Sequence, residues 1–188
     1  MSRHYENTEV LLQACLKNDR RAQLEVYDRY YHAMYNTALR IVKDPATAED
    51  ILQDSFLNAF TKLETFKGEV TFGAWLKRIV INNSIYQYRK QQKMQEVPLE
   101  SVLYKVEDNN GAEVGQGSTE RMAQKVLETM KQLKDSYRVS LTLHFIEGYD
   151  YEEISDIMDI SYGNCRTLIS RAKKSLKKKL MTSDHETQ

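Results

Sequence analysis

Apolar side chains recur every three and four residues over about the first ninety residues of this 188-residue chain. This period is that of an amphipathic α-helix with one buried face. A chain of this length suits one ordinary domain or two small ones, and the pattern predicts an all-α protein. One expected helix face holds Tyr27, Tyr31, Met34, Tyr35, Ala38, Ile41 and Val42.

Two further helices are expected before residue 95. Asp44 and Pro45 suit an N-cap and the first helical position, and Thr71 can cap a long helix after a break at residues 66–69. The helix after Pro45 is expected to bury Ala48, Ile51, Leu52, Ser55, Phe56 and Ala59. The long helix carries two stripes, Phe72, Leu76, Ile79, Asn83 and Tyr86 on one and Trp75, Arg78, Asn82, Ile85 and Arg89 on the other. Phe72, Leu76 and Ile79 are assigned to the core, with Tyr86 as a further candidate.

Residues 95–118 have no helical period and contain a proline and several glycines. Between Met94 and Glu120 six acidic residues stand against Lys105 alone. This composition is typical of a flexible linker. The sequence therefore predicts two small helical domains, residues 1–94 and 120–181, joined by a flexible acidic linker, residues 95–119, and followed by a tail, residues 182–188.

The second domain is expected to begin with a helix whose apolar stripe is Met122, Val126, Met130 and Leu133. The next segment is ambiguous, because Val139, Leu141, Leu143 and Phe145 alternate as they would in a β-strand. A helix is nevertheless predicted there, since the segment is short, lies among helices and is closed by Gly148.

A helix-turn-helix pattern follows. Residues 151–159 predict a short helix with Tyr151, Ile154, Ile157 and Met158 on its buried side. Residues 159–161 form a tight joint in which Ser161 can cap a second helix, residues 162–180. The hundred-degree step of that helix gives a packed face of Cys165, Leu168, Ile169, Ala172, Leu176 and Leu180. The free face carries Arg166, Thr167, Ser170, Lys174 and Lys177.

The last helix is basic although the formal net charge of the chain is zero. Residues 163–181 hold seven basic side chains and no acidic one. A helix of this kind fits the DNA major groove, where Arg reads guanine edges and Lys mostly meets phosphates. The competing interpretation is a solvated basic face on a terminal helix, but the short helix and capped joint before it favour DNA binding.

No motif points to catalysis, a metal or a cofactor, so the chain is not expected to be an enzyme. The two cysteines form no CxxC pattern and the four histidines are scattered. No phosphate-cradling glycine loop is found. No apolar run approaches the roughly 18 residues of a membrane span, so we expect a soluble cytoplasmic protein without membrane insertion and without a small-molecule substrate.

Four segments carry a resemblance to a known family. Residues 148–176, which begin Gly-Tyr-Asp-Tyr-Glu-Glu-Ile, resemble region 4 of extracytoplasmic-function sigma factors in the sigma-70 family. Residues 27–31, 44–60 and 72–79 resemble region 2 of the same family, in the same order. The resemblance runs from about Leu12 to Leu180 and leaves the linker unmatched. It implies a helical bundle in region 2, a helix-turn-helix in region 4, and a subunit that directs core RNA polymerase to promoters.

The resemblance also implies roles for particular residues. The clamp coiled coil of the largest polymerase subunit would be bound by Glu49, Asp50, Gln53, Asp54 and Asn58, while the flap of the second-largest subunit is a further expected contact. The −10 element would be opened and bound by Arg78, Asn82, Asn83, Tyr86 and Arg89, with Asn82 at the base-contacting position. The −35 element would be bound by Arg166, Thr167, Ser170, Arg171, Lys173 and Lys174. Arg171 and Lys173 lie off the centre of the free face and suit phosphate contacts.

Several alternatives stay open. Glu49, Asp50 and Asp54 also suit a plain solvated helix face. The linker either enters the polymerase active-site channel or serves only as a spacer. The resemblance implies a repressing anti-sigma partner. A stand-alone helix-turn-helix regulator that binds palindromic DNA as a dimer is the competing function, and it leaves the motifs of residues 44–60 and 72–89 unexplained.

Overall fold

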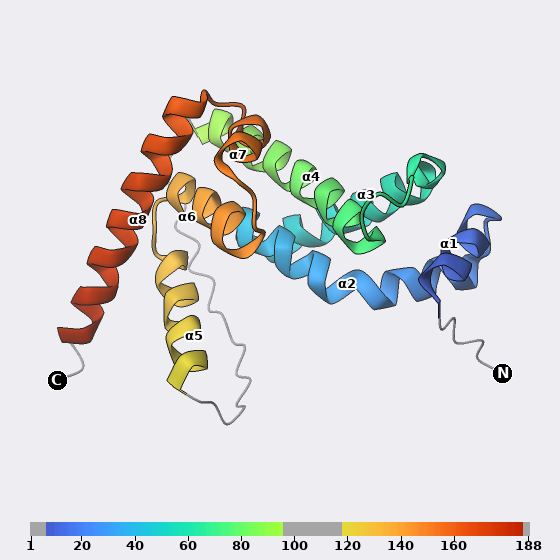
Figure 1. Ribbon diagram of the computed structural model, residues 1–188, viewed down its shortest axis with the longest axis horizontal. Helices are drawn as coiled ribbons and strands as arrows, with labels where there is room; N and C mark the ends of the chain where they lie inside the picture. Colours follow the sequence, from blue (N-terminus) through green and yellow to red (C-terminus); the bar gives the residue numbers. More distant parts are fainter. Residues whose placement is uncertain (1–6, 96–117, 186–188) are drawn as a thin grey trace. The chain divides into compact units, whose positions relative to one another are not determined.

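The computed structural model describes residues 7–95 and 118–185, and the chain divides into two compact units, Met1–Met94 and Gln95–Gln188 (Figure 1). Within the described ranges every regular element is helical, which confirms the all-α prediction. The predicted linker lies outside these ranges except for its ends, because one helix extends to Gln95 and the next begins at Ser118.

The first unit contains α1 (Thr8–Leu16), α2 (Arg20–Val42), α3 (Pro45–Thr61), the short 3₁₀ turn η1 (Leu63–Thr65) and α4 (Phe72–Gln95). α2 packs along α3 and also against α1, while η1 touches both α1 and α3 (Figure 1). α4 contacts α2 through Tyr30, whose ring meets Phe72 edge-on with the ring centres 5.3 Å apart. A Cβ on Gly73 would lie only 3.0 Å from the same Tyr30 ring, so a small residue allows this approach.

Side-chain caps define where these helices begin. Asp19 accepts from the backbone N–H groups of Arg21 and Ala22, and Asp44 accepts from that of Thr47 with Pro45 at the first turn. The Thr71 hydroxyl accepts from the N–H of Ala74 at 3.3 Å, as expected for the cap of α4. These oxygens satisfy backbone donors that a helix leaves open at its start.

The inward face predicted for α3 is confirmed, since all six of its residues are buried. The face predicted for α4 is wrong in part. Val80, Ile81 and Ser84 are buried, whereas Tyr86, a candidate core residue, is 67% exposed. α4 touches α2 at Tyr30 and α3 at Ser55, and its buried residues extend beyond a single stripe. Ser84 tolerates burial because its hydroxyl donates to the backbone carbonyl of Val80 at 2.7 Å.

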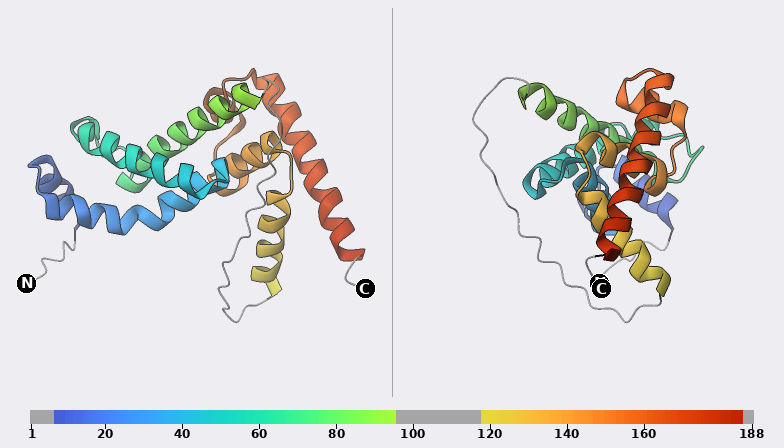
Figure 2. Two further views of the ribbon diagram at one scale, coloured as in Figure 1. Left: turned by 180° about the vertical axis from the view of Figure 1, so that it is seen from behind. Right: turned by 90° about the vertical axis from the view of Figure 1, so that its left-hand side faces the viewer.

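The second unit contains α5 (Ser118–Lys131), α6 (Asp135–Leu141), the π-helical turn η2 (Thr142–Ile146), α7 (Tyr151–Met158) and α8 (Tyr162–His185). α8 is the organising element, because α5, α6 and α7 all pack against it (Figure 2). In the stripe predicted for α5, Met130 and Leu133 are buried, but Met122 near the start of the helix is 61% exposed.

The ambiguous segment around residues 139–145 is helical, as predicted. The alternation of apolar and polar residues does not reflect burial here, because Ser140 and Thr142 are buried together with Leu141 and Leu143. The Ser140 hydroxyl donates to the backbone carbonyl of Tyr137 at 3.0 Å. The chain then leaves η2 through Gly148, whose φ of +81° lies in the left-handed region.

The predicted helix-turn-helix is confirmed. Asp150 and Glu153 form a reciprocal capping box at the start of α7. α7 ends at Asp159, which takes a left-handed φ of 52°, and the hydroxyl of Ser161 then accepts from the N–H of Asn164 at 3.2 Å. Both ends of the joint are therefore set by local hydrogen bonds, which defines where α8 begins.

Candidate nucleic-acid and polymerase interfaces

α8 is anchored on one side and open on the other. Cys165, Ile169 and Ala172 are fully buried. Burial also raises the pKa of the Cys165 thiol, so Cys165 serves packing and not reactivity. Most of the predicted −35 residues are exposed on the other side, namely Arg166, Thr167, Ser170, Arg171 and Lys174. The Thr167 hydroxyl donates to the backbone carbonyl of Gly163 at 3.0 Å, so its oxygen remains available as an acceptor.

The start of α8 is also accessible. A Cβ on Gly163 would meet no atom within 4 Å, and Tyr162 is 47% exposed. Tyr162 was not among the predicted residues, although its place directly after the Ser161 cap is the signal that could have singled it out. A helix that enters the major groove presents its first turns to the bases.

Lys173 differs from the other predicted −35 residues because it is half-buried. Its ammonium donates to the Tyr151 hydroxyl at 3.1 Å and lies 5.1 Å from the centre of the Phe145 ring. It therefore points toward α7 and η2, away from the open face.

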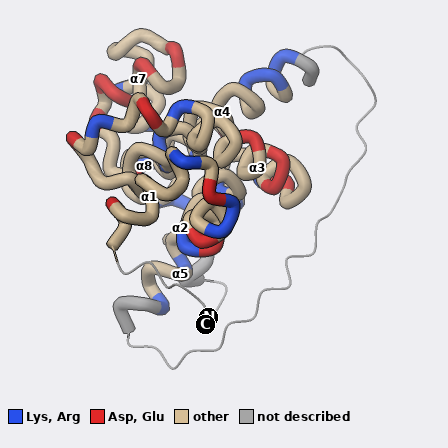
Figure 3. Tube along the Cα trace, turned by 90° about the vertical axis from the view of Figure 1, so that its right-hand side faces the viewer, with Lys and Arg blue, Asp and Glu red and all other residues tan. Residues whose placement is uncertain are grey.

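α4 carries a second open stripe. Arg78, Asn82 and Tyr86 are exposed and follow each other at steps of four, so they share one face, with half-buried Arg89 beside them. Lys90 and Lys93 are exposed as well and continue the stripe, although neither was among the predicted residues. Figure 3 shows basic residues at this end of α4. The spacing of the two lysines from Tyr86, four and seven residues, is the signal that could have found them.

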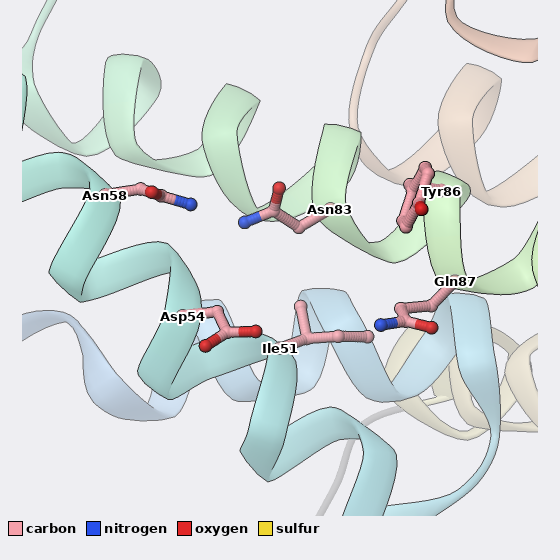
Figure 4. A pocket seen from close by; sticks show the side chains of 6 residues that line it. All are labelled: Ile51, Asp54, Asn58, Asn83, Tyr86 and Gln87. Carbon is pink, nitrogen blue, oxygen red and sulfur yellow. The ribbon is translucent and has the colours of Figure 1, made fainter.

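Asn83 belongs to a different surface from Asn82. Its amide nitrogen donates to the hydroxyl of Ser55 at 2.9 Å, which ties α4 to the buried face of α3. The side chain lines a shallow pocket between the two helices (Figure 4). The pocket is lined by Ile51, Asp54, Asn58, Asn83, Tyr86 and Gln87. Two predicted polymerase contacts and two predicted DNA contacts thus meet in one hollow.

The outer face of α3 is polar and acidic. Asp50, Gln53, Asp54 and Asn58 are exposed, as a docking face requires. Leu57 lies among them and is 65% exposed, and the sequence analysis missed it. Its position three residues after Asp54 and one before Asn58 is the pattern that could have revealed it. An apolar side chain ringed by polar ones is typical of an interface.

Glu49 is set apart from this face because it is half-buried. Its carboxylate accepts a hydrogen bond from the Tyr31 hydroxyl on α2. This hydrogen bond is the main reason that the pKa of Tyr31 is raised to about 12. The Tyr31 ring is in turn stacked on Tyr35, with ring centres 5.8 Å apart and planes 7° from parallel. Glu49 is thus held by α2, with its carboxylate aligned by a phenol.

The described parts of the chain contain neither a metal site nor a membrane span. No group of three or more His, Cys, Asp or Glu side chains is placed to hold a metal ion in residues 7–95 and 118–185. Within the same residues, no helix combines the length and apolar character needed to cross a bilayer.

Comparison with family models matches both units. The model described as Sigma-70 region 2 covers residues 26–94, and the model described as Sigma-70, region 4 covers residues 123–176. Together they account for more than half of the chain. The first match contains α3 and α4 with their polar faces, and the second contains the helix-turn-helix.

Curated relatives match along the whole chain. The ECF RNA polymerase sigma-E factor of Salmonella typhimurium is 28% identical over 179 residues, which cover 92% of this chain and 93% of the relative. The RNA polymerase sigma-H factor of Pseudomonas aeruginosa is 28% identical over 182 residues, with 93% of this chain and 94% of the relative covered. The sigma-E factor of Escherichia coli is 27% identical over 179 residues, at 92% and 93% coverage.

Solved structures agree on the fold. The sigma factor RpoE from Bartonella quintana, in complex with the anti-sigma factor NepR, matches with a TM-score of 0.52 and 23% identity over 84% of this chain and 95% of that one. CnrH, in complex with the cytosolic domain of CnrY, matches with a TM-score of 0.51 and 21% identity over 93% and 97%. The family models and relatives together show that this chain belongs to the extracytoplasmic-function group of the sigma-70 family, whose members bind RNA polymerase and direct it to promoters.

Proposed function

We propose that this sigma factor directs RNA polymerase by gripping a promoter at two places, the −35 element with α8 and the −10 element with α4. The observation that carries the proposal is that each unit presents one open basic helix face, with Arg166 on α8 and Arg78 on α4 as examples. The chain supplies recognition and the polymerase supplies the chemistry.

At the −35 element, α8 would enter the major groove with its anchored side turned away from DNA. Arg166 can form a two-pronged hydrogen bond with a guanine edge, while Thr167 and Ser170 can reach bases or phosphates. Arg171 and Lys174 suit phosphates, which position the helix without reading sequence. The absence of acidic side chains from residues 163–181 keeps this face free of repulsion with the backbone.

At the −10 element, α4 would hold single-stranded DNA as the duplex opens. The exposed amide of Asn82 can pair with the hydrogen-bonding edge of an unstacked base, and the exposed ring of Tyr86 offers a surface on which a base can stack. Arg78 and Arg89 lie along the same helix and would meet phosphates, with Lys90 and Lys93 farther along it.

For polymerase docking, the outer face of α3 would meet the clamp coiled coil. Asp50 and Asp54 would steer the chain toward a basic partner, and Leu57 would supply the apolar contact in their midst. Glu49, held by Tyr31, would add a preoriented acceptor at the edge. The second unit would contact the flap of the second-largest subunit.

Regulation by an anti-sigma protein is part of the proposal. The resemblance implies it, and the similar structures of RpoE and CnrH are complexes with NepR and with the cytosolic domain of CnrY. The chain would act in the cytoplasm, where its relatives serve RNA polymerase. A stand-alone regulator would need only the helix-turn-helix and gives no reason for the region 2 match at residues 26–94.

The test is reconstitution of transcription. Purified protein is added to core polymerase, the complex is isolated, and the holoenzyme selects its own promoter from a pool of random DNA. We expect transcripts that start at a fixed distance from two enriched elements. Arg166→Ala should lose about 1–3 kcal/mol at the −35 element. Failure to bind core, or initiation without sequence preference, would overturn the proposed function.

A further inference from the structure

Lys173 contacts two elements of its own unit. It lies one residue after buried Ala172 and three before buried Leu176, at the border of the packed face of α8. Its ammonium is 3.1 Å from the Tyr151 hydroxyl, 5.1 Å from the centre of the Phe145 ring and 5.7 Å from the centre of the Tyr151 ring. The Phe145 ring attracts the cation by the negative charge density of its face. At Tyr151 the contact is the hydrogen bond, because the ammonium lies beyond the hydroxyl and not over the ring. The lysine therefore joins α8 to η2 and to α7 at one point.

His144 supports the aromatic side of this contact. Its ring packs on both partners, with its centre 5.0 Å from that of Phe145 and 5.0 Å from that of Tyr151. One nitrogen of His144 lies 3.0 Å from the carbonyl oxygen of Tyr149, which orients the imidazole. Tyr151 is the first residue of α7, directly after Asp150 of the capping box. The Phe145 ring, which is 56% exposed, and the Tyr151 hydroxyl together receive the ammonium group.

The next lysine on α8 behaves differently. Lys174 and Lys177 are exposed, whereas Lys173 is half-buried. If the Lys173 ammonium turned toward a phosphate, it would leave the Tyr151 hydroxyl and the Phe145 ring. Lys173 is therefore positioned for a contact within its own unit, whereas Lys174 is accessible to a partner.

We propose that Lys173 is a positioning residue, which fixes the angle of α8 on α7 and η2 through Tyr151 and Phe145 and makes no contact with DNA phosphate. This inference rests on the proposed −35 role of α8. The angle between the two helices of the motif decides where Arg166 and Ser170 meet the bases while α7 crosses the backbone. A lysine that holds this angle strengthens promoter binding without adding a charge contact.

Salt dependence separates the two roles. Each phosphate contact contributes about 0.9 to the slope of log K against log salt concentration. The full chain is assembled with core polymerase, and closed-complex formation on the selected promoter is measured at several KCl concentrations. We expect Lys173→Met to weaken binding by roughly threefold to tenfold at every concentration, with the slope of wild type. Lys174→Met is the matched control and should lower the slope by about 0.9.

Three companion variants test the aromatic receptor. Lys173→Arg should restore most of the affinity, because a guanidinium also packs on rings and donates a hydrogen bond. Tyr151→Phe and Phe145→Leu should each weaken binding at unchanged slope, and Phe145→Leu combined with Lys173→Met should cost little more than either alone. Thermal unfolding checks that each variant is folded. If Lys173→Met fails to fold, Tyr151→Phe and Phe145→Leu decide the question by the same criterion.

The inference is overturned if Lys173→Met lowers the slope as Lys174→Met does, if it binds like wild type, or if its loss adds in full to that of Phe145→Leu. The proposed −35 role is judged separately by Arg166→Ala. An Arg166→Ala holoenzyme that selects DNA like wild type refutes that role, whereas a changed slope in Lys173→Met refutes only the positioning.

Discussion

At the scale of single residues, Asn82 and Asn83 are neighbours in sequence with different surroundings. Asn82 is exposed on the open face of α4, whereas Asn83 donates to the buried Ser55 hydroxyl. We expect Asn82→Ala to leave stability and core binding intact and to impair promoter opening, because only the unstacked base loses a partner. The check is fluorescence of 2-aminopurine placed in the −10 element, which rises when the base unstacks.

Asn83→Ala is the matched control for that experiment. It removes a hydrogen bond between helices, so it should lower the free energy of unfolding by about 0.5–1.5 kcal/mol. Urea unfolding measures this difference. If Asn82→Ala and Asn83→Ala lower stability equally, the two amides are not distinct in the way their contacts indicate.

At the scale of elements, the start of α3 depends on Asp44. Its carboxylate accepts hydrogen bonds from the Thr47 hydroxyl at 2.6 Å and from the Thr47 N–H at 2.7 Å. Both bonds lower the pKa of Asp44, and the bond from the hydroxyl has the larger effect. Asp44→Ala should cost about 0.5–2 kcal/mol of unfolding free energy, while Asp44→Asn keeps a cap and should cost less.

The lowered pKa of Asp44 also predicts a pH dependence. A carboxyl whose pKa is lower in the folded state adds stability above its unfolded pKa, near 3.9, and loses it as the pH falls through the folded value. The stability advantage of wild type over Asp44→Asn should therefore be complete at pH 6 and shrink below about pH 4. Urea midpoints measured across that range are the test, and an advantage that grows on acidification would contradict it.

Two glycines of the second unit offer a matched pair. Gly148 has a φ of +81° at the exit of η2, whereas Gly163 lies in the first turn of α8, and a Cβ on either would meet no atom within 4 Å. Gly148→Ala should cost about 1–2 kcal/mol from backbone strain alone. Gly163→Ala should stabilise by about 0.5–1 kcal/mol, because alanine favours a helix. Opposite shifts of the melting temperature are expected, and a stabilised Gly148→Ala would contradict the left-handed geometry.

The sequence predicted elements best where a helix has one buried face. All six inward residues of α3 follow from its period, and the Asp44, Thr71 and Ser161 caps follow from local chemistry. The core of α4 was only partly predictable, because Val80, Ile81 and Ser84 are buried outside the predicted stripe. The contacts of Lys173 could not be predicted, since Tyr151 and Phe145 lie 22 and 28 positions away and only tertiary packing joins them. Periodicity therefore predicts which face of a helix is buried, but not which residues pack against it.

At the scale of the whole molecule, the formal net charge of zero is the sum of acidic and basic regions that lie apart in the sequence. Figure 3 shows acidic residues on α3 and basic residues at the end of α4. Basic residues also lie along α8. In the proposed function the acidic face would meet a basic protein partner, and the basic faces would meet DNA. Because the two kinds of face are separate, substitutions on one are expected to spare the other.

Leu57 allows that separation to be tested. It is 65% exposed in the middle of the acidic face of α3, so Leu57→Asp should leave the fold intact. The change replaces the apolar centre of the docking face with a charge that must be desolvated, and we expect core polymerase binding to weaken by at least tenfold, about 1.4 kcal/mol. Leu24→Asp is the control, because Leu24 is 60% exposed on α2, outside that face. Pull-down of core polymerase measures the difference, and equal loss in both variants would mean that α3 is not the docking helix.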